Sequence, residues 1–214
     1  MAIAYDNSLN GNSSTSYSYT CSGSNRLLIL GVLVIQPAVP TATYNGVSMT
    51  VLDSLSDNLG ISLYVFYLLN PASGSNTLTY TNGGSGAVGS VAVSYTGVKQ
   101  SSFPDSNAQI KGANTISPIT ASTTVISSNC WVASISMSDT NSGTATISDN
   151  VTSRQAASPV NFSPTTKYDA CDTNGTVSTG SNSISFTIGG DGSAIVFSMA
   201  PALNTANGNF LTFM

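Results

Sequence analysis

Hydrophobic and polar residues alternate with period two along most of the chain, which is the pattern of strands with one buried face. The segment Cys130–Ser138 shows it most clearly, because its apolar residues fall on one face and its serines on the other. The same alternation predicts strands at Thr15–Thr20, Asn76–Thr81, Ala87–Tyr95, Ser183–Ile188 and Ser193–Met199.

Two further segments, Leu27–Ile35 and Ile61–Leu69, are apolar on both faces. Runs of this kind are typical of central strands that are covered on both sides. A helix is the competing interpretation, and we reject it because the runs are short and rich in β-branched or aromatic residues. Pro37 follows the first run and Asn70-Pro71 the second, and both favour a strand end.

Turn residues separate the predicted strands. Asn45-Gly46 suits a tight hairpin, and no segment has a convincing helical period. Val98–Pro118 is interpreted as a crossover, and Asp139–Asp172 is the most loop-like stretch. With about a dozen strands, the chain is predicted to be all-β, a two-sheet antiparallel β-sandwich, jelly-roll-like. We expect one domain over residues 1–203 and a C-terminal tail over 204–214.

Composition narrows the chemistry. Only 7% of the residues are charged, against about 25% in an ordinary domain. Without histidine, the chain has no Ser-His-Asp or Cys-His catalytic pair and no histidine ligand for zinc. Five Lys and Arg residues against nine acids, all of them Asp, argue against nucleic-acid binding.

The N-terminal segment, the lengths of the apolar runs and the cysteines indicate where in the cell the protein is made. Residues Met1–Asp6 have no basic and no long apolar region, so we expect no signal peptide, and no run is long enough for a membrane helix. Cys21, Cys130 and Cys171 are odd in number, and we expect all three to be reduced and buried. Synthesis in a cytoplasm with a hydroxyl-rich surface fits a virion protein.

Acid–base and metal chemistry have few candidates. The Asp pairs 53 and 57, 139 and 149, and 169 and 172 lie in polar stretches where Asp normally caps or forms turns, so we expect no enzyme. We expect no cofactor. A structural calcium ion is the alternative, at Asp139–Gly143 or Asp169–Gly175, although neither stretch has the bidentate Glu of a full calcium loop.

Aromatic residues and the tail supply candidate binding residues. A core position is the default interpretation for the tyrosines and for Trp131, and the alternative is glycan contact through exposed rings. The candidates for glycan contact are Tyr17, Tyr19, Tyr64 and Tyr168. The candidates for partner binding are Phe210, Leu211, Phe213 and Met214, behind the polar spacer Asn204–Asn209. This apolar end either docks on a neighbouring subunit or packs on its own sandwich.

Several longer motifs follow one another in a fixed order. They are Gly23-Ser24-Asn25-Arg26-Leu27-Leu28-Ile29-Leu30-Gly31-Val32, Thr43-Tyr44-Asn45-Gly46-Val47-Ser48-Met49-Thr50, Leu63-Tyr64-Val65-Phe66-Tyr67-Leu68-Leu69-Asn70-Pro71, Gly74-Ser75-Asn76-Thr77-Leu78-Thr79 and Val93-Ser94-Tyr95-Thr96-Gly97-Val98-Lys99-Gln100. The series resembles a jelly-roll-like β-sandwich domain of phage structural proteins and bacterial surface proteins.

The resemblance covers residues 2 to 104, and the second half matches more loosely, through Trp131-Val132 and Ser193-Ala194-Ile195-Val196. Val65-Phe66-Tyr67 departs from it, where a charged residue and Trp are usual. It implies a fold and carries no catalytic residues. Within the first motif, we expect Arg26 to pair with an Asp or to cap loop carbonyls.

These observations predict a non-enzymatic structural protein of a phage particle, most simply a capsid decoration or cement protein, or otherwise a short tail or fibre component. The expected partners are the major capsid protein or another virion protein, and further copies of the chain in a homo-oligomer. The alternative is a carbohydrate- or receptor-binding module of a phage tail or of a bacterial surface protein.

Overall fold

The structure is a computed structural model that describes residues 1–12, 14–35, 39–56, 60–81, 87–112, 118–139, 150–157, 166–187 and 191–203. These residues form antiparallel strands and no helix. In the first half the strands are β1 (Ala4–Asn12), β2 (Ser16–Cys21), β3 (Leu27–Ile35), β4 (Ala42–Tyr44), β5 (Val47–Ser48), β6 (Thr50–Ser56), β7 (Ile61–Leu69), β8 (Gly74–Tyr80) and β9 (Ala87–Thr96). In the second they are β10 (Ser106–Gly112), β11 (Ile119–Val125), β12 (Trp131–Asp139), β13 (Thr152–Ala157), β14 (Thr166–Asp172), β15 (Gly180–Phe186) and β16 (Asp191–Met199).

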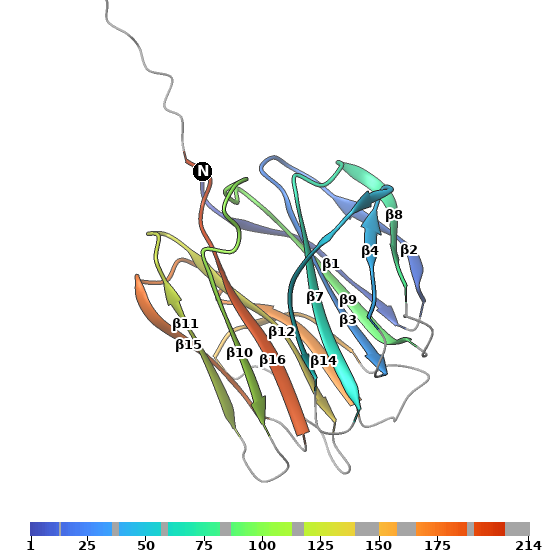
Figure 1. The fold of residues 1–214 in the computed structure, drawn as a ribbon. Helices are drawn as coiled ribbons and strands as arrows, with labels where there is room; N and C mark the ends of the chain where they lie inside the picture. Colours follow the sequence, from blue (N-terminus) through green and yellow to red (C-terminus); the bar gives the residue numbers. More distant parts are fainter. Residues whose placement is uncertain are drawn as a thin grey trace, which may run out of the picture.

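The described strands form four layers. Two five-stranded sheets, β1-β9-β3-β7-β6 and β10-β16-β12-β14-β13, pack face to face in the middle. The sheet β2-β8-β4-β5 covers the outer face of the first, and the pair β11-β15 covers the outer face of the second. Figure 1 shows the two halves side by side, blue to green and green to red. The central strands therefore have no solvent-exposed face, which explains their unbroken apolar runs.

The second half repeats the topology of the first. If β1, β9, β3, β7 and β6 are matched in that order with β10, β16, β12, β14 and β13, the two five-stranded sheets have the same strand order. The pair β2-β8 then corresponds to β11-β15. A β-bulge recurs as well, between Val51 and Asp53 on β6 and between Ser153 and Gln155 on β13. The chain is a tandem repeat of one two-sheet unit.

The amino-acid sequence carries traces of this repeat. Gly-Ser-Asn-Thr-Leu-Thr-Tyr in β8 corresponds to Gly-Ser-Asn-Ser-Ile-Ser-Phe in β15. Both strands start at a glycine with positive φ, Gly74 at 84° and Gly180 at 103°. The following asparagines, Asn76 and Asn182, each donate Nδ2 to the carbonyl of that glycine, at 3.2 and 3.0 Å. The two repeats thus begin this strand with the same side-chain cap.

Gly31 of β3 and Ile135 of β12 meet at the centre of the interface between the repeats. The strand registers make these two positions equivalent, since Leu27 and Trp131 face Tyr95 and Met199 respectively. A Cβ atom on Gly31 would lie 2.5 Å from the Cγ2 methyl of Ile135. Equivalent positions that touch each other mark an approximate two-fold relation. The side chain of Ile135 from the second repeat fills the space that the absent side chain of Gly31 leaves in the first repeat.

The structure confirms the all-β class and the predicted strands at β2, β3, β7, β8, β9, β12, β15 and β16. The jelly-roll connectivity stays a prediction. Two segments differ from expectation: the predicted crossover contains β10 and the loop-like stretch contains β13 and β14. The sandwich also has four layers in place of two, because each repeat contributes its own outer sheet.

We expect Gly31→Ala to destabilise the protein, because the added methyl group collides with Ile135 in a packed interface. Overpacking of this kind typically costs about 1–3 kcal/mol. Urea unfolding measures the loss, and Gly175→Ala is the control because its Cβ would come no closer than 3.8 Å to the nearest atom.

A double variant, Gly31→Ala with Ile135→Ala, tests the contact itself. If the two side chains collide, the pair loses less stability than the sum of the two single losses. Strict additivity would mean that Gly31 is required for another reason.

Candidate functional site

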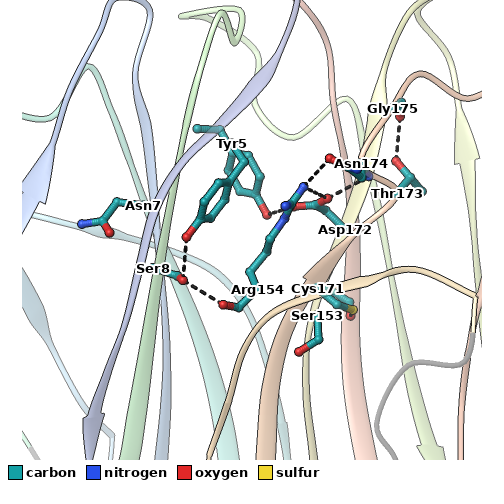
Figure 2. Close-up of polar contacts among 12 residues, drawn as sticks. Tyr5, Asn7, Ser8, Ser153, Arg154, Cys171, Asp172, Thr173, Asn174 and Gly175 are labelled. Atoms are coloured by element: carbon teal, nitrogen blue, oxygen red, sulfur yellow. Dashed lines mark hydrogen bonds and ion pairs between the residues drawn. The ribbon is translucent and has the colours of Figure 1, made fainter.

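The most connected polar group of the described residues surrounds Asp172, at the end of β14. Arg154 donates Nε to Oδ2 of Asp172 at 2.7 Å and Nη2 to Oδ1 at 2.8 Å (Figure 2). Asp172 is fully buried and 13% of the Arg154 side chain is exposed. Arg154 is the extra residue of the β13 bulge, and a bulge redirects a side chain in this way.

Three further residues complete this cluster. The Tyr95 hydroxyl donates to Oδ2 of Asp172 at 3.0 Å, and the backbone N–H of Asn174 donates to Oδ1 at 2.8 Å. Nη2 of Arg154 also donates to Oδ1 of Asn174 at 2.7 Å. The ring of Tyr5 lies over the guanidinium, 4.5 Å from its centroid to Cζ. Since Tyr5 and Tyr95 belong to the first repeat, the cluster joins the two repeats.

Electrostatics favour a fixed ion pair here. The hydrogen bond to Asp172 is the main cause that raises the pKa of Arg154 above its usual value. Burial, followed by the charge of Asp172, raises the pKa of Tyr95 well above 10.0. Both oxygens of Asp172 already accept two hydrogen bonds each, so the carboxylate has no position left for a substrate proton. The cluster is a structural clasp between the repeats.

A second polar contact occurs once in each repeat. Asp6 accepts hydrogen bonds from Ser22 N at 2.9 Å and from Ser94 Oγ at 2.7 Å. Asp105, the equivalent residue before β10, accepts from Ile126 N at 2.8 Å and Ser127 Oγ at 2.6 Å, and from Ser198 Oγ at 3.4 Å. Each carboxylate ties the end of an outer strand to the central sheet. These two acids are therefore structural.

Asp105 has a perturbed pKa. Burial raises it, but the hydroxyl of Ser127 and the backbone N–H groups of Ile126 and Ser127 lower it, and together they outweigh burial. The net pKa is below the ordinary 3.8. The ionised form is thus the one that the fold stabilises.

Arg26 caps loop carbonyls, one of the two predicted roles. It donates Nε to the Pro71 carbonyl at 2.7 Å, Nη1 to the Gly23 carbonyl at 2.6 Å and Nη2 to Oδ1 of Asn70 at 3.0 Å. These bonds join the loop before β3 to the loop after β7. The arginine closes one end of the first repeat.

All three cysteines are free and buried, as predicted. Burial raises the pKa of Cys21 to about 11 and that of Cys130 to about 12. Thiols with such values are poor nucleophiles near neutral pH. The cysteines behave as small core side chains.

Of the three candidate carboxylate pairs, only Asp169 and Asp172 lie wholly among the described residues. Asp57 and Asp149 lie outside the described residues. The expectation that Asp169 and Asp172 form turns is wrong, because both are fully buried in strand β14, on opposite faces. Within the described part of the chain, no group of three or more Cys or Asp residues is arranged to hold a metal ion. Of the two suggested calcium loops, residues 140–143 are not described, and Asp172 of the other binds Arg154.

The four tyrosines proposed for glycan contact divide into two pairs. Tyr19 and Tyr168 are 1% and 0% exposed, so a sugar cannot reach either ring, and both belong to the core. The Tyr168 hydroxyl donates to Oδ1 of Asn10, and that of Tyr19 donates to the Asn7 carbonyl. Tyr17 and Tyr64 are partly exposed. Trp131 is in the core, as predicted.

The end of the molecule that holds Met1 contains a cavity of about 520 Å³. The loop Ser127–Asn129, Thr176 and the segment Ala200–Leu203 line it. The cavity is lined by Met1–Ile3 and Lys99 as well. The predicted partner-binding residues Phe210, Leu211, Phe213 and Met214 lie outside the described residues.

Comparison of the chain with protein-family models, with curated proteins and with solved structures found no match. Among the described residues, no helix has the length and apolar content that a membrane span requires.

We expect Asp172→Asn to cost up to about 3 kcal/mol of stability, the lower end of the range for a fully buried pair, since it leaves the partly buried Arg154 without its counter-charge. Urea unfolding measures the loss, and Asp53→Asn, on the edge strand β6, is the matched control.

The first repeat has Leu52 and Tyr67 at the positions of Arg154 and Asp172. The double variant Arg154→Leu/Asp172→Tyr should therefore lose less than the two single changes combined. A loss equal to their sum would contradict the clasp.

Asp105 gives a prediction for pH. Because its pKa is lower in the folded than in the unfolded state, it stabilises the fold above about pH 3.8, and this contribution disappears as the pH falls through the folded-state value. Asp105→Asn should lower the melting temperature near neutral pH, and the difference from the wild type should shrink in strong acid. Thermal unfolding followed by circular dichroism between pH 2 and 7 tests this. A difference that does not change with pH would refute it.

Proposed function

We propose that this chain is a non-enzymatic structural protein of a phage particle, a decoration or cement protein that stabilises the shell by lateral protein contacts. The supporting observation is how the charged side chains are used. Asp6, Asp105, Asp172, Arg26 and Arg154 all make internal contacts that hold strands or loops in place. These five charged side chains stabilise the fold through their internal contacts.

Exposed apolar side chains support association. Met1, Ile126 and Leu203 are 47%, 69% and 84% exposed, and all three lie at or next to the cavity. Exposed apolar side chains beside a cavity are typical of a contact surface. Few charges need to be desolvated there, because Lys99 is the only charged side chain that lines the cavity.

The four-layer fold suits this role. The two outer sheets enclose the central pair, so that each repeat has a core on both sides of its five-stranded sheet. The resemblance of residues 2 to 104 to sandwich domains of phage structural proteins points in the same direction.

The alternative, a carbohydrate- or receptor-binding module, keeps less support. Only Tyr17 and Tyr64 of its four tyrosines retain exposure, and Tyr17 bonds through its hydroxyl to Ser90 Oγ at 3.1 Å. Sugar sites usually present an open aromatic face. No such face lines the cavity.

Re-addition to particles that lack the protein tests the proposed function. We expect the purified chain to co-sediment with the particles and to raise the temperature at which they release their genome, because a ligand that binds only the intact shell stabilises it. An unrelated β-sandwich of similar size is the control. Absence of co-sedimentation, or specific signals on a glycan array that Tyr64→Ala abolishes, would contradict the proposal.

A further inference from the structure

The cavity has a counterpart in the first repeat, and there it is closed. The loop before β3 contains Ser24-Asn25, and the loop before β12 contains Ser128-Asn129 at the equivalent positions. In the first repeat, the N–H groups of Gly97 and Val98 donate to the carbonyls of Ser24 and Asn25, both at 3.0 Å. The chain that follows β9 thus seals its own loop.

The second repeat cannot close in this way. Pro201 takes the place of Gly97, and proline has no N–H. Ala202 takes the place of Val98, but its N–H donates to the Gly97 carbonyl at 2.7 Å. Among the described residues, no backbone N–H donates to the carbonyl oxygen of Ser128 or Asn129. The cavity lies between this loop and the Ala200–Leu203 segment.

By comparison with the first repeat, an extended polypeptide that presents backbone N–H groups would satisfy the carbonyls of Ser128 and Asn129. The exposed side chains of Met1 and Leu203, together with Ile126 beside the loop, favour apolar side chains on that polypeptide. Apart from the N-terminal ammonium, which donates to the Ala202 carbonyl, Lys99 is the only charge in the lining, so an uncharged segment fits best.

We propose that the segment Asn204–Met214 of a second copy occupies this cavity, and that two copies exchange these segments reciprocally. The segment has no charged side chain, and it has four apolar residues among its last five. Its polar part, Asn204–Asn209, follows Leu203 of the cavity lining in the sequence, and six residues span about 20 Å when extended, enough to cross to a facing cavity. This inference rests on the proposed lateral association and names its contact.

Reciprocal exchange explains why Met1, Ile126 and Leu203 are exposed beside the cavity in a single copy. Two copies related by a two-fold axis would place their cavity ends opposite each other, which is the commonest symmetry of homo-oligomers. Met1, Ile126 and Leu203 of both copies would then be covered together. The exposed side chains become a single buried patch.

The test uses the purified full chain and sedimentation equilibrium. We expect a dimer whose dissociation constant rises at least tenfold in Phe210→Ser/Phe213→Ser and in Ser128→Trp, which fills the cavity mouth. Val47→Ser/Val51→Ser and Ser73→Trp are the controls, because they make comparable apolar-to-polar and small-to-large changes at exposed positions that do not line the cavity, and they should dimerise as the wild type does. Equal melting temperatures of Ser128→Trp and Ser73→Trp would exclude misfolding as the cause.

A photo-cross-linking residue at position 213 identifies the occupant. In a mixture of isotopically light and heavy chains, cross-links to Ser127–Asn129 should join light to heavy chains. Cross-links within one chain only, a monomer at all concentrations, or a dimer unaffected by either variant would each overturn the proposal. Particle binding is measured separately, so a dimer that fails to bind particles contradicts the proposed function and leaves this inference standing.

Discussion

Face-to-face packing of the two five-stranded sheets is the contact on which the rest of the structure depends. An approximate two-fold relation forces equivalent positions to meet near its axis, as Gly31 and Ile135 do. Two glycines there would leave a gap and two isoleucines would collide. Joining both repeats in one chain removes this restriction, because each copy of the position is free to change. The interface can then reach the packing density of a core.

The same freedom explains how the repeats diverge elsewhere. At one pair of positions the first repeat has Leu52 and Tyr67 against the shared core, and the second has Arg154 and Asp172. Burial of an ion pair contributes little net stability, but its directional bonds fix one arrangement, here to Tyr5 and Tyr95 of the other repeat. The apolar pair fills space, whereas the ionic pair also sets how the repeats align.

The alternation of apolar and polar residues predicts strands that have one apolar and one polar face. It does not predict strands that bury polar side chains. β14 reads as a loop because Asp169 and Asp172 interrupt its apolar residues, and hydrogen bonds from residues distant in the sequence, among them Ser153 and Arg154, make their burial acceptable. The sequence signal of the repeat is weak: Gly74–Tyr80 and Gly180–Phe186 are alike, and Thr-Ala-Thr occurs at 41–43 and again at 144–146. The clasp and the cavity have no local signal, because both combine residues from opposite ends of the chain.

The two repeats differ most where the chain leaves them. After β9 the chain continues across its own loop, so that Gly97 and Val98 satisfy the carbonyls there, and Arg26 closes the neighbouring turn. After β16 a proline removes the matching donor, and Ala202 pairs with the first repeat instead. One unit is thus sealed, whereas in the other no described backbone N–H reaches the carbonyls of Ser128 and Asn129, which lie beside exposed apolar side chains. Because an extended chain offers N–H groups at the spacing that Gly97 and Val98 show in the first repeat, this end of the molecule is suited to the polypeptide proposed above.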